Sequence, residues 1–150
     1  MTWAHLHLAL NHVPVIGTFL VILLFGAAVV RGSGELLRAS YGLIILLAVI
    51  ALGVYFTGEP AEKLIEHLAG FSEPLVERHE EAALIATIGI SIVGLLSVAG
   101  LTLRVGNWYP RAVFLLTLVV AALMGWTANL GGQIRHSEIR GVGQVTTGER

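Results

Sequence analysis

The sequence predicts an all-α membrane protein, an up-down bundle of four transmembrane helices with a short interfacial helix in the second loop. Of its 150 residues, 55% are hydrophobic and only 13% are charged, about half the charged fraction of a soluble domain. Four apolar runs have the length of about 20 residues that a helix needs to cross the hydrocarbon of a bilayer. They cover residues 13–30, 36–58, 82–103 and 112–130.

The charges of the connections between these runs predict the orientation of the helices across the membrane. Residues 31–38 contain two Arg and one Glu, and residues 104–111 contain two Arg and no acid, whereas residues 59–81 contain seven Glu against Lys63 and Arg78. The positive-inside rule places the two arginine-containing loops in the cytoplasm. Both termini and the acidic loop are then expected on the periplasmic face of a bacterial inner membrane. The short cytoplasmic loops make the helices that they join antiparallel neighbours.

The start of the chain is expected to be a retained helix. Residues 1–11 contain no Lys or Arg, whereas a cleaved secretory signal begins with a positively charged segment. Pro14 suits the first turn of a helix, so the residues before about Asn11 are expected to form a separate segment. The chain is predicted to be one domain over residues 1–140, followed by a flexible Gly- and Thr-rich tail over residues 141–150.

The acidic loop carries two further signals. Residues 61–68 place Leu64, Ile65 and Leu68 on one side of a helix and charged residues on the other, which predicts a short helix in the membrane interface. Ser72-Glu73-Pro74 then combines an N-cap type residue with a proline in the first turn. This signal predicts that the third spanning helix begins there.

Composition excludes several classes of function. The chain has no cysteine, so disulfides, thiolate metal sites, iron–sulfur clusters and covalently attached c-type haem are excluded. The formal net charge is -1 and no basic patch interleaves with aromatic residues, which argues against a nucleic-acid partner. The lipid bilayer is the expected surrounding.

All six histidines fall on the predicted periplasmic side. Among them, His12, His79 and His136 open or close three different spans at a similar depth, so a bundle can bring them together. These three imidazoles are the expected ligands of a metal or a metal cofactor. His7 is a further candidate, for which ligation and an interfacial position are both open. His5 and His67 are interpreted as interfacial histidines in the headgroup region.

Small residues lie at helical spacing before His136 and after His79. Reading back from His136 gives Gly132, Asn129 and Gly125, which are candidate cofactor-lining residues. Reading forward from His79 gives a second stripe of mostly small residues, namely Ala82, Ala83, Ala86, Ile90 and Gly94. Small residues allow helices to pack closely, and they also leave room for a flat macrocycle. Close packing is the more common reason for any single stripe.

The candidate chemistry is the binding of one or two b-type haems by histidines from facing helices. A transition-metal ion, zinc, copper or non-haem iron, is the alternative. It would use the same histidines with the carboxylates of Glu59, Glu62, Glu80 and Glu81. A di-iron site is disfavoured because Val76 stands where a Glu-x-x-His motif ending at His79 would need Glu.

Four motifs are spread along the chain between residue 5 and about residue 140. They run over residues 7–14, as His-Leu-Ala-Leu-Asn-His-Val-Pro, and over residues 57–62, 78–83 and 131–136, the last reading Gly-Gly-Gln-Ile-Arg-His. With these motifs the chain resembles a bacterial family of four-span membrane proteins of unknown function. The resemblance implies a shared site on the outer face that uses His7, His12, His79 and His136. Ser137 departs from the family pattern, where proline is expected.

Taken together, these features predict a membrane b-type cytochrome that exchanges electrons with quinol or with a periplasmic redox protein. No histidine lies near the cytoplasmic face, so this chain cannot by itself build a haem pathway across the bilayer. A non-haem metal protein and a cofactor-free accessory subunit are the alternatives, and enzymatic activity, any catalytic residue and homo-oligomerisation are left open. A transporter is disfavoured because the spans hold no charged residue well inside.

Overall fold

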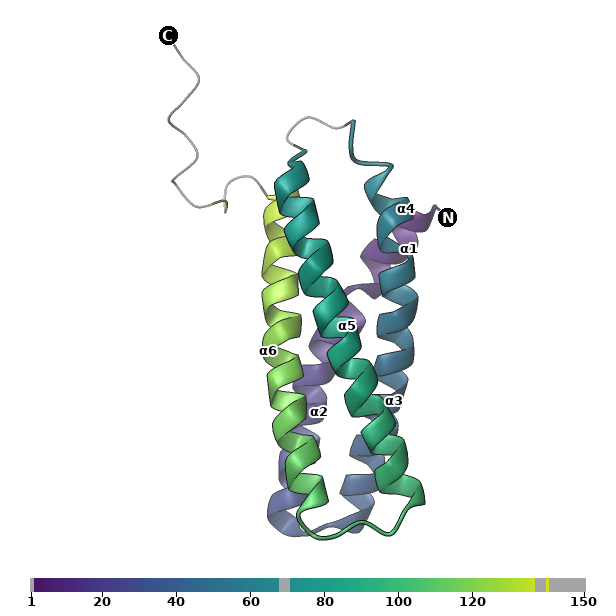
Figure 1. Cartoon of the computed structure of the whole chain (residues 1–150), viewed down its shortest axis with the longest axis vertical. Coiled ribbons are helices and arrows are strands. Elements are labelled where there is room, and N and C mark those ends of the chain that lie inside the picture. The colour runs from purple at the N-terminus through teal and green to yellow at the C-terminus, as the bar shows by residue number, and fades with distance from the viewer. Residues whose placement is uncertain (1, 68–70, 137–139, 141–150) are drawn as a thin grey trace.

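The computed structural model describes residues 2–67, 71–136 and 140, and every regular element in them is a helix. The elements are α1 (Trp3–Leu10), α2 (His12–Arg31), α3 (Gly34–Phe56), α4 (Gly58–Glu62), α5 (Glu73–Thr102) and α6 (Tyr109–Arg135) (Figure 1). Four segments are long and apolar enough to span a membrane, namely Trp3–Arg31, Gly34–Phe56, Glu73–Thr102 and Tyr109–Ile134. The all-α, four-span architecture is therefore confirmed. The expected flexible tail, residues 141–150, lies outside the described residues.

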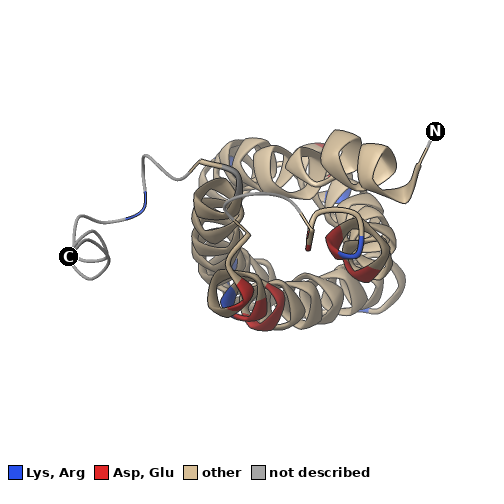
Figure 2. Ribbon diagram, turned by 90° about the horizontal axis from the view of Figure 1, so that it is seen from above, with Lys and Arg blue, Asp and Glu red and all other residues tan. Residues whose placement is uncertain are grey.

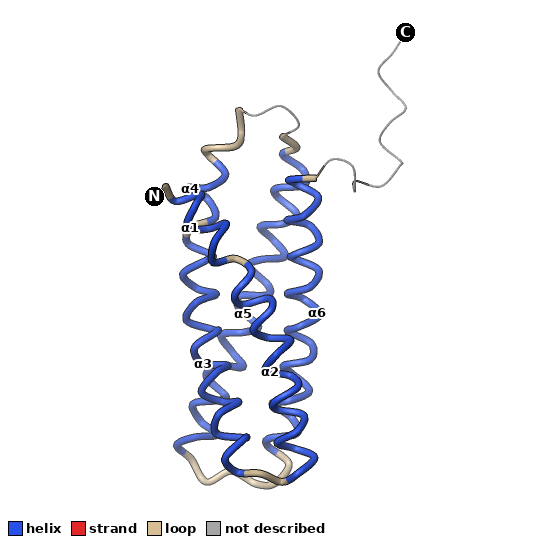
Figure 3. Tube along the Cα trace, turned by 180° about the vertical axis from the view of Figure 1, so that it is seen from behind, coloured by secondary structure: helices blue, strands red, loops and turns tan. Residues whose placement is uncertain are grey.

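The four long helices form a ring in the order α2, α3, α5, α6, and each packs against its two neighbours (Figure 2). Consecutive helices run in opposite directions, so the connections lie at the two ends of the bundle (Figure 3). One end, called the arginine end, carries Arg31, Arg38, Arg104 and Arg111. The opposite end carries α1, α4, the start of α5 and the candidate histidines, and is called the histidine end.

The bundle is apolar inside and outside. Phe25, Ile44 and Ile90 are completely buried between the helices. On the outer surface, Leu23, Leu95 and Phe56 are 71–73% exposed. An apolar exterior is what a lipid-embedded helical bundle requires. The chain is thus a multi-pass membrane protein with its core between four spans.

The small-residue stripe on α5 faces this core. Ala82, Ala86, Ile90 and Gly94 are buried, and Ala83 is half-buried. A Cβ atom at Gly94 would lie 2.9 Å from the Cβ of Ala48 on α3, closer than such atoms approach. Glycine therefore allows α3 and α5 to pack closely, and close packing accounts for this stripe.

The helix break near Asn11 agrees with the sequence expectation. The ring of Pro14 has no N–H to donate to the carbonyl of Leu10, so the helical ladder is interrupted there. α1 ends at Leu10 and α2 begins at His12, with Asn11 at the joint. The joint lets α1 leave the line of α2 and pack against α3 and α4.

The interfacial helix expected over residues 61–68 is placed differently. The helical residues are those of α4, Gly58–Glu62, and hydrogen-bonded turns continue as far as His67, with Leu68 outside the described residues. Pro60 favours the first turn of a helix, so the helix begins directly after α3. The bonds from the Leu64 and Ile65 amides to carbonyls three residues earlier tighten and end it. α5 begins at Glu73 after Ser72, as expected.

Candidate functional site

His7 is fixed by the end of α3. Its Nδ1 lies 3.0 Å from Thr57 Oγ1 and 3.2 Å from the carbonyl oxygen of Val54. The Thr57 hydroxyl already donates to the Val54 carbonyl at 2.7 Å, so both oxygens can only accept from the imidazole. The ring proton therefore sits on Nδ1. In the neutral ring, Nε2 keeps its lone pair.

His79 is fixed in the same way by α6. Its Nδ1 donates to the carbonyl oxygen of Thr127 at 3.0 Å. Gly131 follows Thr127 by one helical turn and has no side chain to cover this carbonyl. A Cβ atom at Gly131 would lie 3.1 Å from Cε1 of His79. The half-buried ring is thus packed against a glycine, again with its proton on Nδ1 and a lone pair on Nε2.

His7 on α1 and His79 on α5 both lie at the histidine end of the bundle, within electrostatic range of each other. The two imidazoles are near enough for a charge on one to act on the other. In the described part of the chain, no hydrogen bond forms at Nε2 of either ring. Histidines that bind metals usually donate their second N–H to a carbonyl or carboxylate, which orients the ring and selects the tautomer. Both rings have this arrangement.

The other predicted ligands are more exposed than this pair. His12 is exposed at the first residue of α2, and His136 is exposed at the C-cap of α6. His5 bonds locally to Thr2, and the side chain of His67 is 85% exposed beside Glu66. Within residues 2–67, 71–136 and 140, no group of three or more His, Asp or Glu side chains is placed to hold a metal ion.

The structure gives the surroundings of two predicted lining residues of α6, Asn129 and Gly125. Asn129 is exposed, and its Oδ1 accepts a hydrogen bond from Gln133 Nε2. Gly125 faces Phe19, whose ring would lie 3.7 Å from an added Cβ atom. The glycine whose added Cβ atom would meet the His79 ring is Gly131, which is not among the predicted lining residues. His136, from which the stripe was counted, lies outside helical geometry, with φ -114° and ψ 94°.

The sequence reasoning missed five partners of the pair. Thr57 and Gly131 lie inside the motifs that carry the family resemblance, and Asn11 lies between the two histidines of the first motif. The motifs could therefore have indicated these three positions from the sequence. Val54 and Thr127 act through their backbone carbonyls, which leave no trace in the residue type.

One polar atom near the pair is without a partner. The Oδ1 of Asn11 is buried, and it accepts no hydrogen bond from any described residue. Asn11 follows His7 by one helical turn, and its backbone N–H donates to the backbone carbonyl of His7 at 2.9 Å. An orphaned, buried acceptor beside a preorganised imidazole fits a site built for a bound group.

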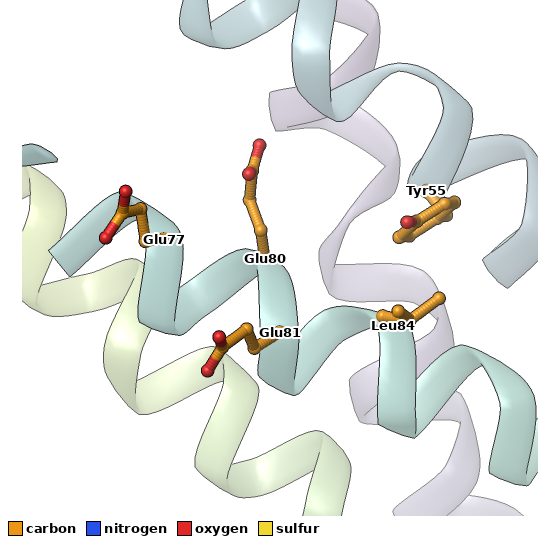
Figure 4. Close-up of a pocket in the computed structure, with 5 residues that line it drawn as sticks. All are labelled: Tyr55, Glu77, Glu80, Glu81 and Leu84. Carbon is orange, nitrogen blue, oxygen red and sulfur yellow. The ribbon is translucent and has the colours of Figure 1, made fainter. Parts of the chain in front are cut away.

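The carboxylates form a separate feature on the outer side of α5. Tyr55, Leu84, Glu77, Glu80 and Glu81 line an open pocket of about 440 Å³ (Figure 4). Glu62 from α4 lies close to Glu80 on α5. Burial and the neighbouring charge of Glu80 raise the pKa of Glu62. Glu59 instead pairs with Lys63 at 2.7 Å on the surface.

Two exposed tryptophans indicate the depth of the site. Trp108, the N-cap residue of α6, is 67% exposed, and Trp126 on α6 is 47% exposed. Tryptophan is enriched at the two interfaces of a bilayer. At the rise of an α-helix the two tryptophans are about 27 Å apart, close to the hydrocarbon thickness. Thr127 follows Trp126 directly. The His79 imidazole that binds its carbonyl is therefore expected at the hydrocarbon boundary.

Comparisons of the chain with protein-family models, curated proteins and solved structures found no match. The family resemblance of the four motifs accordingly stays a prediction. Function has to be inferred from the site itself.

Proposed function

We propose that the protein is a membrane b-type cytochrome that transfers electrons, with haem b held by His7 and His79. The observation that supports this most is the pair of half-buried imidazoles whose Nδ1 protons are engaged by oxygen acceptors. Each ring then offers Nε2 to a metal. Haem, when bound, would supply one-electron chemistry, and the chain would supply the two imidazole ligands and hold their orientation.

The number of ligands favours haem over a non-haem ion. The porphyrin provides four nitrogens, so two imidazoles complete the coordination of the iron. A structural or catalytic zinc site needs three or four protein ligands. The described residues contain no such group. His12 and His136 remain candidates for a second haem or for an alternative transition-metal ion.

The donor set fits this proposal in two further respects. Gly131 leaves room for the His79 ring, and Gly58 lies against Cε1 of His7, with 3.8 Å to an added Cβ atom. The orphaned Oδ1 of Asn11 provides an acceptor beside the pair. A Cβ atom at Gly58 would make an ordinary contact, so the tight approach at Gly131 and the unpaired Asn11 oxygen are the two features that support the proposal here.

We further propose that the histidine end faces the periplasm of a bacterial inner membrane. The four arginines at the other end support this orientation through the positive-inside rule. Quinol or a periplasmic redox protein would then exchange electrons at the histidine end. Because the chain has no cysteine, a single Glu66→Cys or Gly106→Cys variant reports the side of each end by labelling in spheroplasts. Labelling of Gly106→Cys alone by an impermeant reagent would contradict the orientation.

Haem content tests the central proposal. Wild type and the variants His7→Ala, His79→Ala and His67→Ala are purified in detergent, titrated with haem and scanned in the oxidised and reduced states. Wild type and His67→Ala are expected to show a Soret band and split α and β bands. His7→Ala and His79→Ala are expected to lose these bands. Absence of haem binding in wild type, or full binding in both site variants, would overturn the proposal.

A further inference from the structure

The joint between α1 and α2 holds a polar group that the fold does not use. Asn11 adopts a helical conformation, with φ -60° and ψ -27°, so its side chain follows that of His7 on the same helix face. Its Oδ1 is buried and has no partner among residues 2–67, 71–136 and 140. Its neighbours along the chain, Leu10 and His12, do not supply one.

A buried acceptor of this kind is costly to the protein alone. An amide oxygen that leaves water without gaining a donor destabilises the fold, whereas an apolar side chain of similar size at the same place would not. Native proteins leave few buried polar atoms unpaired, and each such atom calls for a reason. The candidate ligand His7, one helical turn earlier, offers a reason for the unpaired oxygen of Asn11.

We infer that Asn11 is a positioning residue, and that its Oδ1 accepts a hydrogen bond from an O–H donor that arrives with the group bound by His7 and His79. This inference rests on the proposed function. Two sources of the donor have the same chemistry: a protonated carboxyl group at the porphyrin edge, or a water molecule bound with the haem. In either case the orphaned atom gains its partner only when the site is loaded.

The test compares loaded and cofactor-free protein. Asn11→Leu removes the amide at similar volume, Asn11→Asp keeps the shape and an acceptor, and Asn107→Leu is a matched control in an exposed turn at the arginine end. Haem affinity, reduction potential and melting temperature are measured for each protein in detergent.

Asn11→Leu is expected to melt at a higher temperature than wild type without haem, and to bind haem about tenfold more weakly, the scale of outer-shell effects at metal sites. Its reduction potential is expected to shift. Asn11→Asp is expected to keep more of the haem affinity, and Asn107→Leu to behave as wild type. A merely structural role would lower the melting temperature of both forms and leave the potential unchanged.

Haem with esterified propionates separates the two donors. If the donor is the porphyrin carboxyl group, wild type and Asn11→Leu bind the diester equally, and if it is water, the difference between them persists. Unchanged haem affinity and potential in both Asn11 variants, with haem bound by wild type, would overturn this inference alone. Failure of wild type to bind haem would overturn the proposed function and this inference together.

Discussion

The imidazole Nδ1 of His79 on α5 and the carbonyl oxygen of Thr127 on α6 are joined by a hydrogen bond of 3.0 Å. The bond crosses between two spanning helices at the histidine end, and it exists because Gly131 leaves the Thr127 carbonyl uncovered. The packing of a membrane bundle and the orientation of a candidate ligand thus depend on the same residues.

Gly131→Ala is expected to disturb this ligand. The added Cβ atom would meet Cε1 of His79 at 3.1 Å, so the ring has to shift away from the Thr127 carbonyl. Haem affinity should fall by about 10-fold or more, as when an outer-shell partner is lost. Gly42→Ala is the control, because a Cβ atom there meets nothing within 4 Å. Equal affinity of the two variants, measured by haem titration, would speak against the assigned role of Gly131.

Thr57→Val is expected to weaken the hydrogen bonding that orients the His7 ring. The hydroxyl of Thr57 accepts from His7 Nδ1 at 3.0 Å, and valine has no acceptor to replace it. Haem affinity should fall by about 10-fold. Thr57→Ser keeps the hydroxyl and should restore most of the affinity in the same titration. A serine variant as weak as the valine variant would show that the methyl packing of Thr57, and not its hydrogen bond, matters.

Tyr41→Phe is expected to stabilise the bundle or leave it unchanged. The ring is 1% exposed between Phe25 and Gly100, and its hydroxyl oxygen has no partner among the described residues. Removing an unpaired buried hydroxyl should raise the free energy of unfolding by about 1 kcal/mol. Unfolding in mixed detergent micelles measures this. A loss of 1 kcal/mol or more would mean that the hydroxyl has a partner that stabilises the fold.

Glu62→Gln is expected to flatten the pH dependence of stability. Burial and the charge of Glu80 raise the pKa of Glu62 in the folded state, so folded protein binds its proton more tightly than unfolded protein. Stability is then greatest below the ordinary glutamate pKa of about 4.3 and declines as pH rises through the raised value. Between the ordinary and the raised pKa, thermal melts of Glu62→Gln should show a smaller loss of stability with rising pH than melts of wild type. An equally steep decline in Glu62→Gln would contradict the assignment to this carboxyl.

Much of the fold could be predicted because lipid imposes simple requirements. A run of about 20 apolar residues has to be a helix in hydrocarbon, and the four spans follow from that alone. The break at Asn11 followed from the missing N–H of Pro14. The start of α5 at Glu73 followed from the Ser72-Glu73-Pro74 signal. The short helix of the second loop was less predictable, because it begins at Gly58, directly after α3, and not at Ala61.

The candidate site was predictable only in part. Residue type identified His7 and His79, but the partner atoms at Val54 and Thr127 are backbone carbonyls, which every residue carries. Gly131 was not predicted, because the small-residue stripe was counted back from His136, and that residue caps α6 outside helical geometry.

The most direct test is the electron paramagnetic resonance spectrum of the haem-loaded ferric protein. Two imidazole ligands give low-spin ferric iron, so wild type should show a low-spin signal, and His7→Ala and His79→Ala should each convert any bound haem to the high-spin form. A high-spin signal in wild type, or a low-spin signal kept by both variants, would contradict the pairing of His7 with His79.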